Sequence, residues 1–100
     1  MTFDFLPRLA QLCAEINPKP TNQSITGYNP TVFLEFSGHV NLVTVSIFEN
    51  GWISGSDPNF VYRIYPYLDI VDGFMENSVP IVCDLDSVFS HLEKIKETFI

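Results

Sequence analysis

The sequence predicts an α+β fold: a two-layer sandwich in which an antiparallel β-meander of three to four strands is covered by an N-terminal and a C-terminal helix. Two runs rich in β-branched and aromatic residues, 31–37 and 40–49, alternate apolar and polar positions. That period of two is typical of a strand with one buried face. Apolar positions spaced three and four apart near both ends of the chain predict the helices. We expect the 100 residues to form a single domain.

The N-terminal helix is expected over residues 4–16, where Leu9 and Leu12 share one face with other apolar residues. Asp4 is the expected N-cap, which would place Pro7 in the first turn, where a missing N–H costs nothing. The chain from Asn17 to Pro30 has the composition of a loop.

A second helix is expected near the C-terminal end, capped by Asp86 or Ser87. Its apolar stripe is spaced three to four residues apart and contains Val88, Leu92, Ile95 and Phe99.

The first β run places Val32, Leu34 and Phe36 on one face and Phe33, Glu35 and Ser37 on the other. Gly38-His39 is expected to connect it to the second run. Asn50-Gly51 follows the second run and predicts a type I′ turn, which needs positive φ at both central residues. The central part of the fold is therefore an antiparallel meander.

The remaining strands are less regular. Phe60 to Tyr65 alternates well enough for a third strand, and Pro66 marks its end. Residues 67–71 fit either a short strand or one helical turn, and residues 74–78 are expected to form a loop. Residues 79–83 are short and apolar, and their proline predicts either an edge strand or an extended approach to the final helix.

Charge is the most informative property of the composition. Twelve acidic residues against five basic ones give a net charge of −7, and residues 57–86 hold six of the acids but only Arg63 as a base. This balance argues against direct binding of nucleic acid, which requires Lys and Arg on the phosphates. It favours a protein partner with a basic surface, although acidity also keeps a small protein soluble.

Cys13 and Cys83 lie far apart, each in an apolar run, and are expected to be free thiols in a reducing compartment. No apolar run approaches the roughly 20 residues of a membrane span. The first residues lack the basic region of a signal peptide. We therefore expect a cytoplasmic protein that does not bind a membrane.

Residues 81–89 end an apolar segment with Asp84-Leu-Asp86, which resembles the first motif of the haloacid-dehalogenase-like phosphatases. The resemblance implies Asp84 as nucleophile, Asp86 as acid and base, and a magnesium ion. In that family the motif opens a large parallel-sheet domain, whereas fourteen residues follow Asp86 here. We therefore assign both carboxylates to the start of the final helix, where negative charge is favoured.

The sequence contains no recognisable catalytic or metal-binding pattern. His39 and His91 belong to no nucleophile motif, and no two histidines have metal-ligand spacing. No calcium-loop spacing is present among the acidic residues. We expect no catalytic residues, no metal site and no cofactor.

Aromatic and acidic residues occur together between residues 52 and 76. Two helices can cover one face of the sheet, which leaves the other face for a partner. Exposed Tyr and Trp carry much of the energy of protein interfaces. The predicted partner-binding residues are Trp52, Asp57, Tyr62, Tyr65, Tyr67, Asp69, Asp72 and Glu76.

In its format (short, acidic, one domain, no catalytic motif) the chain resembles the accessory proteins of bacteriophages and prophages, among them the anti-CRISPR inhibitors. The resemblance implies an inhibitor that occupies a basic, nucleic-acid-binding surface of a complex in the host cytoplasm. It rests on format and carries no site residues. Two alternatives remain open: a structural protein whose aromatic sheet face pairs with a copy of itself, and a small divalent-ion-dependent enzyme built on Asp84 and Asp86.

Overall fold

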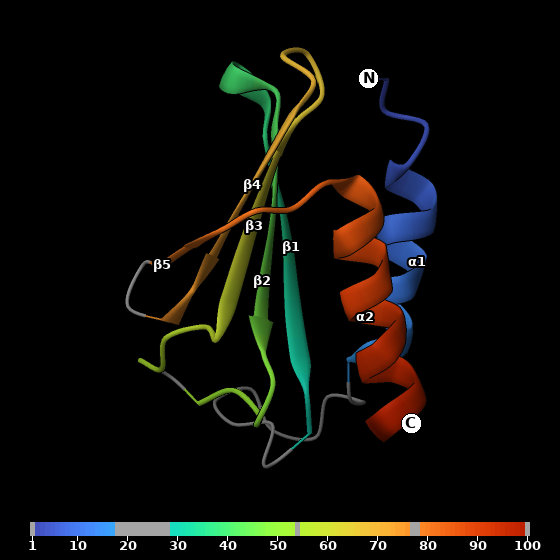
Figure 1. Cartoon of the computed structure of the whole chain (residues 1–100). Coiled ribbons are helices and arrows are strands. Elements are labelled where there is room, and N and C mark those ends of the chain that lie inside the picture. Colours follow the sequence, from blue (N-terminus) through green and yellow to red (C-terminus); the bar gives the residue numbers. More distant parts are fainter. Residues whose placement is uncertain (1, 18–28, 54, 77–78, 100) are drawn as a thin grey trace.

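The alternating runs form a five-stranded antiparallel sheet, and both helices lie against one of its faces (Figure 1). The computed structural model describes residues 2–17, 29–53, 55–76 and 79–99. Its elements follow one another as α1 (Leu6–Ile16), β1 (Thr31–Ser37), η1 (Gly38–Val40), β2 (Leu42–Phe48), β3 (Phe60–Tyr65), β4 (Ile70–Met75), β5 (Val79–Ile81) and α2 (Leu85–Phe99). The predicted α+β sandwich with a terminal helix at each end is confirmed, with five strands instead of three to four.

The sheet is a simple meander, with the strands side by side in chain order from β1 to β5. Register follows the apolar pattern: Val32 lies opposite Ile47, and Val45 opposite Tyr62. Because side chains alternate between faces, these residues all point toward the helices. A shift of one residue would turn the whole set toward the other face, so burial of this set specifies the register.

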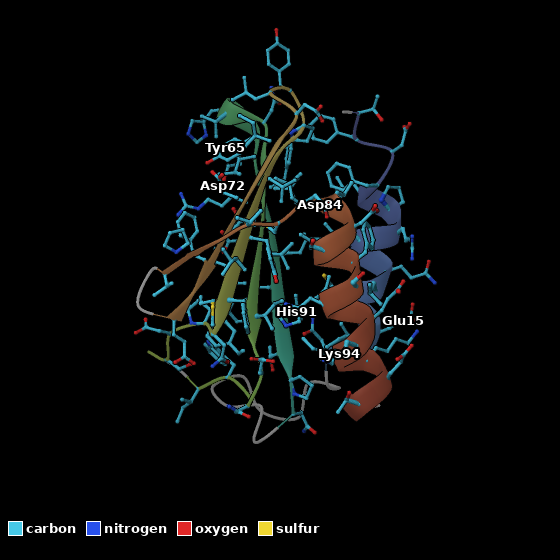
Figure 2. All side chains as sticks on the ribbon, viewed as in Figure 1. Glu15, Tyr65, Asp72, Asp84, His91 and Lys94 are labelled. Carbon is cyan, nitrogen blue, oxygen red and sulfur yellow. The ribbon has the colours of Figure 1, made fainter. Side chains whose placement is uncertain are left out.

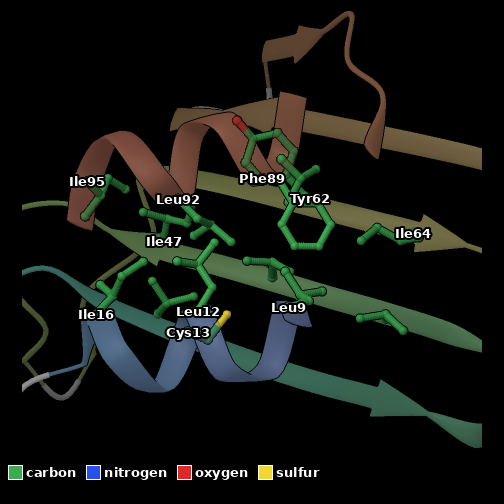
Figure 3. Packing of buried hydrophobic residues seen from close by; sticks show 14 residues of the cluster. Leu9, Leu12, Cys13, Ile16, Ile47, Tyr62, Ile64, Phe89, Leu92 and Ile95 are labelled. Atoms are coloured by element: carbon green, nitrogen blue, oxygen red, sulfur yellow. The ribbon is translucent and has the colours of Figure 1, made fainter. Parts of the chain in front are cut away.

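The core lies between the sheet and the two helices (Figure 3). Figure 3 shows side chains of α1 and α2 pointing at those of β2 and β3. The buried cluster consists of Leu9, Leu12, Cys13, Ile16, Val32, Val43, Val45, Ile47, Tyr62, Ile64, Val88, Phe89, Leu92 and Ile95. On their outer side the helices are linked by ion pairs from Arg8 to Glu93 and from Lys96 to Glu15. Such exposed pairs contribute little, about 0–1 kcal/mol, so the apolar cluster stabilises the layer.

Both helices begin differently from the sequence prediction. Phe5 occupies the N-cap position of α1 and makes no side-chain capping bond, so Asp4 is not the cap. Pro7 does lie at the start of the helix, as expected. In α2 the cap is Asp84, whose Oδ1 accepts hydrogen bonds from the backbone N–H and the hydroxyl of Ser87, each at 2.8 Å. The prediction of Asp86 or Ser87 as the cap was therefore wrong by two to three residues.

Two turns also differ from expectation. Among the described residues, Asn41 and Asp69 are the non-glycine positions with positive φ, and Asn50 is not one of them. Asn50-Gly51 therefore does not form the type I′ turn, although Gly51 has a φ of 94°. Strand β2 ends at Phe48, and the next strand, β3, begins at Phe60. The Gly38-His39 connection is confirmed and forms a short 3₁₀ turn ending at Asn41.

Strand β4 replaces the predicted loop at residues 74–75 and resolves the ambiguity at residues 70–71 in favour of a strand. Asp72-Gly73 resembles a turn in the sequence, but Gly73 lies within β4, opposite Tyr62 and Ile81. A Cβ atom at Gly73 would lie 2.8 Å from Cys83 Sγ and 2.8 Å from Ile81 Cγ1. Glycine is needed here because it lets the β5 segment approach β4 closely. The predicted edge strand is confirmed as β5, while most of the predicted loop between Asn17 and Pro30 lies outside the described residues.

Candidate functional site

The sheet face turned away from the helices is the candidate site. We call it the open face. Its strand residues alternate with those of the core and include Phe33, Glu35, Thr44, Ser46, Phe48, Val61, Arg63, Tyr65, Ile70, Asp72 and Phe74. Figure 2 shows Tyr65 and Asp72 on this side of the sheet and His91 on the other, toward α2. No described helix or strand lies over the open face.

The eight predicted partner-binding residues do not form one patch. Strand β3 is six residues long, which separates its ends by about 17 Å. Asp57 and Glu76 lie beside the first end of β3, and Tyr65 stands at the other end, where the turn to β4 carries Tyr67 and Asp69. The acidic and aromatic residues between positions 52 and 76 therefore lie at both ends of β3 and do not share one surface.

Tyr62 lies in the core, so the prediction that it belongs to a partner-binding surface is wrong. Its side chain points toward α2 and is only 4% exposed. The alternation of β3 was read correctly, but the sequence does not show which face the helices cover. Because Tyr62 lies opposite Val45, it shares the buried face of β2.

An aromatic cluster covers the β1 side of the open face. The ring centroid of Phe33 lies 5.2 Å from that of Phe48 and 5.6 Å from that of Trp52. Phe48 is buried beneath this cluster, whereas Phe33 is 37% exposed. Trp52 is half-buried, so only part of its side chain is available at the surface.

A hollow of about 390 Å³ lies on the β3–β4 side of the open face. Val61 and Phe74 supply apolar surface, and the carboxylates of Asp57 and Glu76 lie at its border. The guanidinium of Arg63 stacks on the Phe74 ring, with its central carbon 4.6 Å from the ring centroid. This geometry is favourable because the face of an aromatic ring attracts a cation. The hollow can accommodate an aliphatic stem with a charged end.

Charge on the open face is one-sided. Glu35, Asp57, Asp72 and Glu76 are carboxylates on or beside it, and Arg63 is the one Lys or Arg there among the described residues. Glu76 accepts a hydrogen bond from the Asn59 side-chain amide, which orients one carboxylate at the border of the hollow. Such a surface attracts cationic groups and repels phosphates.

The turn between β3 and β4 exposes apolar side chains as well. Tyr67 is 85% exposed and Leu68 is 61% exposed. Asp69, which follows them, adopts a left-handed φ of 57°. Tyr67 and Asp69 therefore lie at the surface, at the end of the sheet far from the hollow.

A polar network that the sequence did not reveal joins the sheet to α2. The Tyr62 hydroxyl lies 2.6 Å from Nδ1 of His91, and His91 Nε2 lies 3.8 Å from a carboxylate oxygen of Glu49. The Phe60 ring stands edge-on to the imidazole at a centroid distance of 4.5 Å. Residues from β3, α2 and the end of β2 thus meet at one place, a juxtaposition with no local sequence signal.

Burial determines the protonation states in this network. Desolvation raises the pKa of Tyr62 to about 12, so its hydroxyl keeps its proton in the hydrogen bond with Nδ1 of His91. Desolvation also lowers the pKa of His91, a shift that the nearby Glu49 carboxylate opposes. Nε2 of the same imidazole faces Glu49 at 3.8 Å, a distance too long for a direct hydrogen bond. The network satisfies the polar ends of two buried side chains.

Asp84 and Asp86 lie at the start of α2, where they were expected. The two hydrogen bonds from Ser87 lower the pKa of Asp84, because they favour its charged form. The arrangement is that of a helix cap. Among the described residues, no three His, Cys, Asp or Glu side chains are grouped as metal ligands would be.

The two cysteines are free, with Cys13 buried in the core and Cys83 half-buried beside β4. Burial raises the pKa of the Cys13 thiol to about 11, and burial also raises the pKa of Cys83. Both thiols therefore stay protonated and weakly nucleophilic near neutral pH. The expectation of free thiols is confirmed.

No helix in the described part of the chain combines the length and apolarity needed to span a membrane. Comparisons of the chain with protein-family models, with curated proteins and with solved structures found no match.

Proposed function

We propose that this protein is a non-enzymatic binding module that docks its open face on a basic surface of a partner protein. The observation that carries the proposal is the one-sided sheet: both helices cover one face, and the other presents aromatic and acidic side chains. Four carboxylates against the single Arg63 guanidinium give that face its acidic character.

The physical basis is the combination of charge and apolar area. The carboxylates speed the encounter with a basic surface and align the two proteins. Phe33, Val61 and Phe74 offer apolar surface that a partner can bury. The hollow between Val61 and Phe74 fits the stem of a Lys or Arg side chain, whose charged end would reach Asp57 or Glu76.

A basic surface of this kind is what a nucleic-acid-binding protein presents to phosphates. Carboxylates of the open face would occupy the phosphate positions, so the module would act as an inhibitor, in keeping with the phage-type, anti-CRISPR-like format of the chain. Direct binding of this chain to nucleic acid is disfavoured by the same charge.

Two matched triple variants test the proposal. Asp57→Asn, Asp72→Asn and Glu76→Gln neutralise the open face; Asp4→Asn, Asp86→Asn and Glu97→Gln remove the same charge from exposed positions elsewhere. Each immobilised variant is incubated with bacterial lysate at about 50 mM and about 500 mM salt, and retained proteins are identified by mass spectrometry. We expect a basic nucleic-acid-binding protein that the wild type and the control variant retain at low salt, and that the open-face variant loses.

Added duplex DNA should release the same protein, because both ligands would compete for one surface. Equal loss with both triple variants would show that only net charge matters and would contradict docking through the open face. Solution mass measured on the same samples tests the alternative. A salt-insensitive dimer without a retained partner would favour self-association through the aromatic face.

A further inference from the structure

Strand β1 forms one margin of the sheet, and among the described strands it pairs with β2 alone (Figure 1). The opposite margin, β5, has three residues with Pro80 at its centre. Short length and proline are common protections of a sheet edge. Strand β1 has neither: it is seven residues long and contains no proline.

One end of the β1 edge is closed by a side chain. Asn17 at the end of α1 donates from Nδ2 to the Val32 carbonyl at 2.9 Å and accepts from the Val32 N–H at 2.6 Å. The backbone groups of Val32 therefore point away from β2. Since the direction of these groups alternates along a strand, the N–H and C=O of Leu34 and Phe36 point outward as well.

Beyond Val32, no described residue pairs with the outer edge of β1. Among the described residues, no hydrogen bond reaches the backbone of Leu34 or Phe36 from outside the sheet. Phe36 lies on the helix-covered face but is 55% exposed. Its described aromatic contact is with the Phe3 ring, which lies nearly perpendicular to it at a centroid distance of 5.8 Å. Four backbone groups and an aromatic side chain are thus available to an added strand.

Glu35 determines which strand fits. It lies between the two free positions and points to the open face, and no ion pair joins it to a described cation. In an antiparallel pair, the residue opposite Glu35 would have its Cβ about 5 Å away, where an opposite charge stabilises and a like charge destabilises. A second copy that used both free positions would pair about Glu35 and place two carboxylates together. Self-pairing is therefore disfavoured.

We propose that β1 is a strand-addition site that accepts an extended, basic segment of a partner protein, with Lys or Arg opposite Glu35. This inference rests on the proposed function and specifies how the partner is held. The added strand would extend the sheet beyond β1, with Asn17 setting where pairing stops. Main-chain bonds would supply affinity, and the Glu35 position would supply selectivity.

The probe is a fluorescein-labelled peptide of about nine residues that alternates Thr and Val around a central Lys; a matched peptide carries Glu instead of Lys. Fluorescence anisotropy measures binding to the full chain. We expect the Lys peptide to bind roughly threefold to tenfold more tightly than the Glu peptide. In Glu35→Lys the order should reverse. Equal affinity of both peptides, or no binding of either, would overturn the proposal.

Two variants of one residue test whether the edge itself is used. Phe36→Pro removes the outward N–H without touching the bonds to β2, whereas Phe36→Thr removes the same ring but keeps the N–H. The Pro variant should bind the Lys peptide roughly fivefold to tenfold more weakly than the Thr variant. Thermal unfolding establishes that both variants fold.

Amide hydrogen exchange distinguishes strand addition at β1 from binding through the open face. Exchange at Leu34 and Phe36 should be fast in the free protein and slow in the peptide complex. If the peptide instead perturbs only Val61 and Phe74, it binds the open face. The strand-addition site would then be wrong while the binding function would stand.

Discussion

At the scale of single residues, burial distinguishes side chains that the sequence treats alike. Tyr62 and Tyr67 are both tyrosines in the same acidic-aromatic segment, yet one is 4% exposed and the other 85%. Tyr62 is held beneath α2 by its pairing with Val45, and Tyr67 lies in the turn after β3. His91 is the clearest case of a missed residue, because its partners Tyr62 and Glu49 are 29 and 42 positions away in the chain.

The His91 network predicts loss of stability in mild acid. Desolvation lowers the folded-state pKa of His91 below the unfolded value of about 6.5, so the unfolded chain binds the proton more readily. Stability present above pH about 6.5 is therefore lost as the pH falls through the folded-state pKa. Because the Glu49 carboxylate opposes the effect of burial on this pKa, the loss is limited to about 1 kcal/mol.

Urea unfolding between pH about 7.5 and about 5.5 measures this loss. In His91→Gln the pH dependence should be weaker than in the wild type. His39→Gln, which changes an exposed histidine in η1, is the matched control and should behave as the wild type does. An unchanged slope in His91→Gln would show that carboxylates alone cause the acid sensitivity.

At the scale of elements, regular periodicity predicted α1, β1, β2, β3 and α2, and composition misled at β4. Asp72-Gly73 has the residues of a turn, but Gly73 is selected by the close approach of Ile81 and Cys83 and not by a turn. The sequence predicts Asn17 as the first residue of a loop, whereas in the structure it is the C-cap of α1 and also closes the end of β1. The packing at Gly73 and the hydrogen bonds of Asn17 both involve residues of other elements, so the sequence of the element itself gives no signal for either.

Asn17 should therefore couple the stability of α1 to that of β1. Asn17→Ala leaves the N–H and C=O of Val32 without their partners, and we expect a loss of about 1–3 kcal/mol in the free energy of unfolding. Asn17→Asp keeps the acceptor but replaces the donor with a carboxylate oxygen facing the Val32 carbonyl, so it should not restore stability. Chemical denaturation of both variants measures the effect. A neutral Asn17→Ala would show that water replaces the amide without loss.

At the scale of the whole molecule, the sheet has a packed face and an open face. The same apolar residue type therefore has different roles on the two sides of one sheet. Ile64 is fully buried beneath the helices, whereas Ile70, near the end of the open face, is 45% exposed. This asymmetry leaves a surface for a partner, and it is not visible from composition, which is rich in apolar residues throughout.

Two identical substitutions measure the asymmetry. Ile64→Ala creates a cavity in the core and should lower the free energy of unfolding by about 2–5 kcal/mol. Ile70→Ala removes the same atoms from the open face and should cost less than about 1 kcal/mol. Denaturant unfolding of the two variants gives both values. If Ile70→Ala cost as much as Ile64→Ala, but only at high protein concentration, the open face would be buried by self-association.

The sequence by itself determined the fold class, the two helices, the central strands and the faces of β1, because periodicity of two or three to four residues is local and survives without tertiary context. It also determined the acidic balance on which the proposal of a basic partner rests.

Only the tertiary structure decided which face the helices cover, which aromatic residues are buried, and that Tyr62, His91 and Glu49 meet. It also decided that Asn17 closes one end of the outer edge of β1 by its two hydrogen bonds with Val32. These features depend on contacts between residues far apart in the chain, and the pattern of one element carries no information about which other element it will touch.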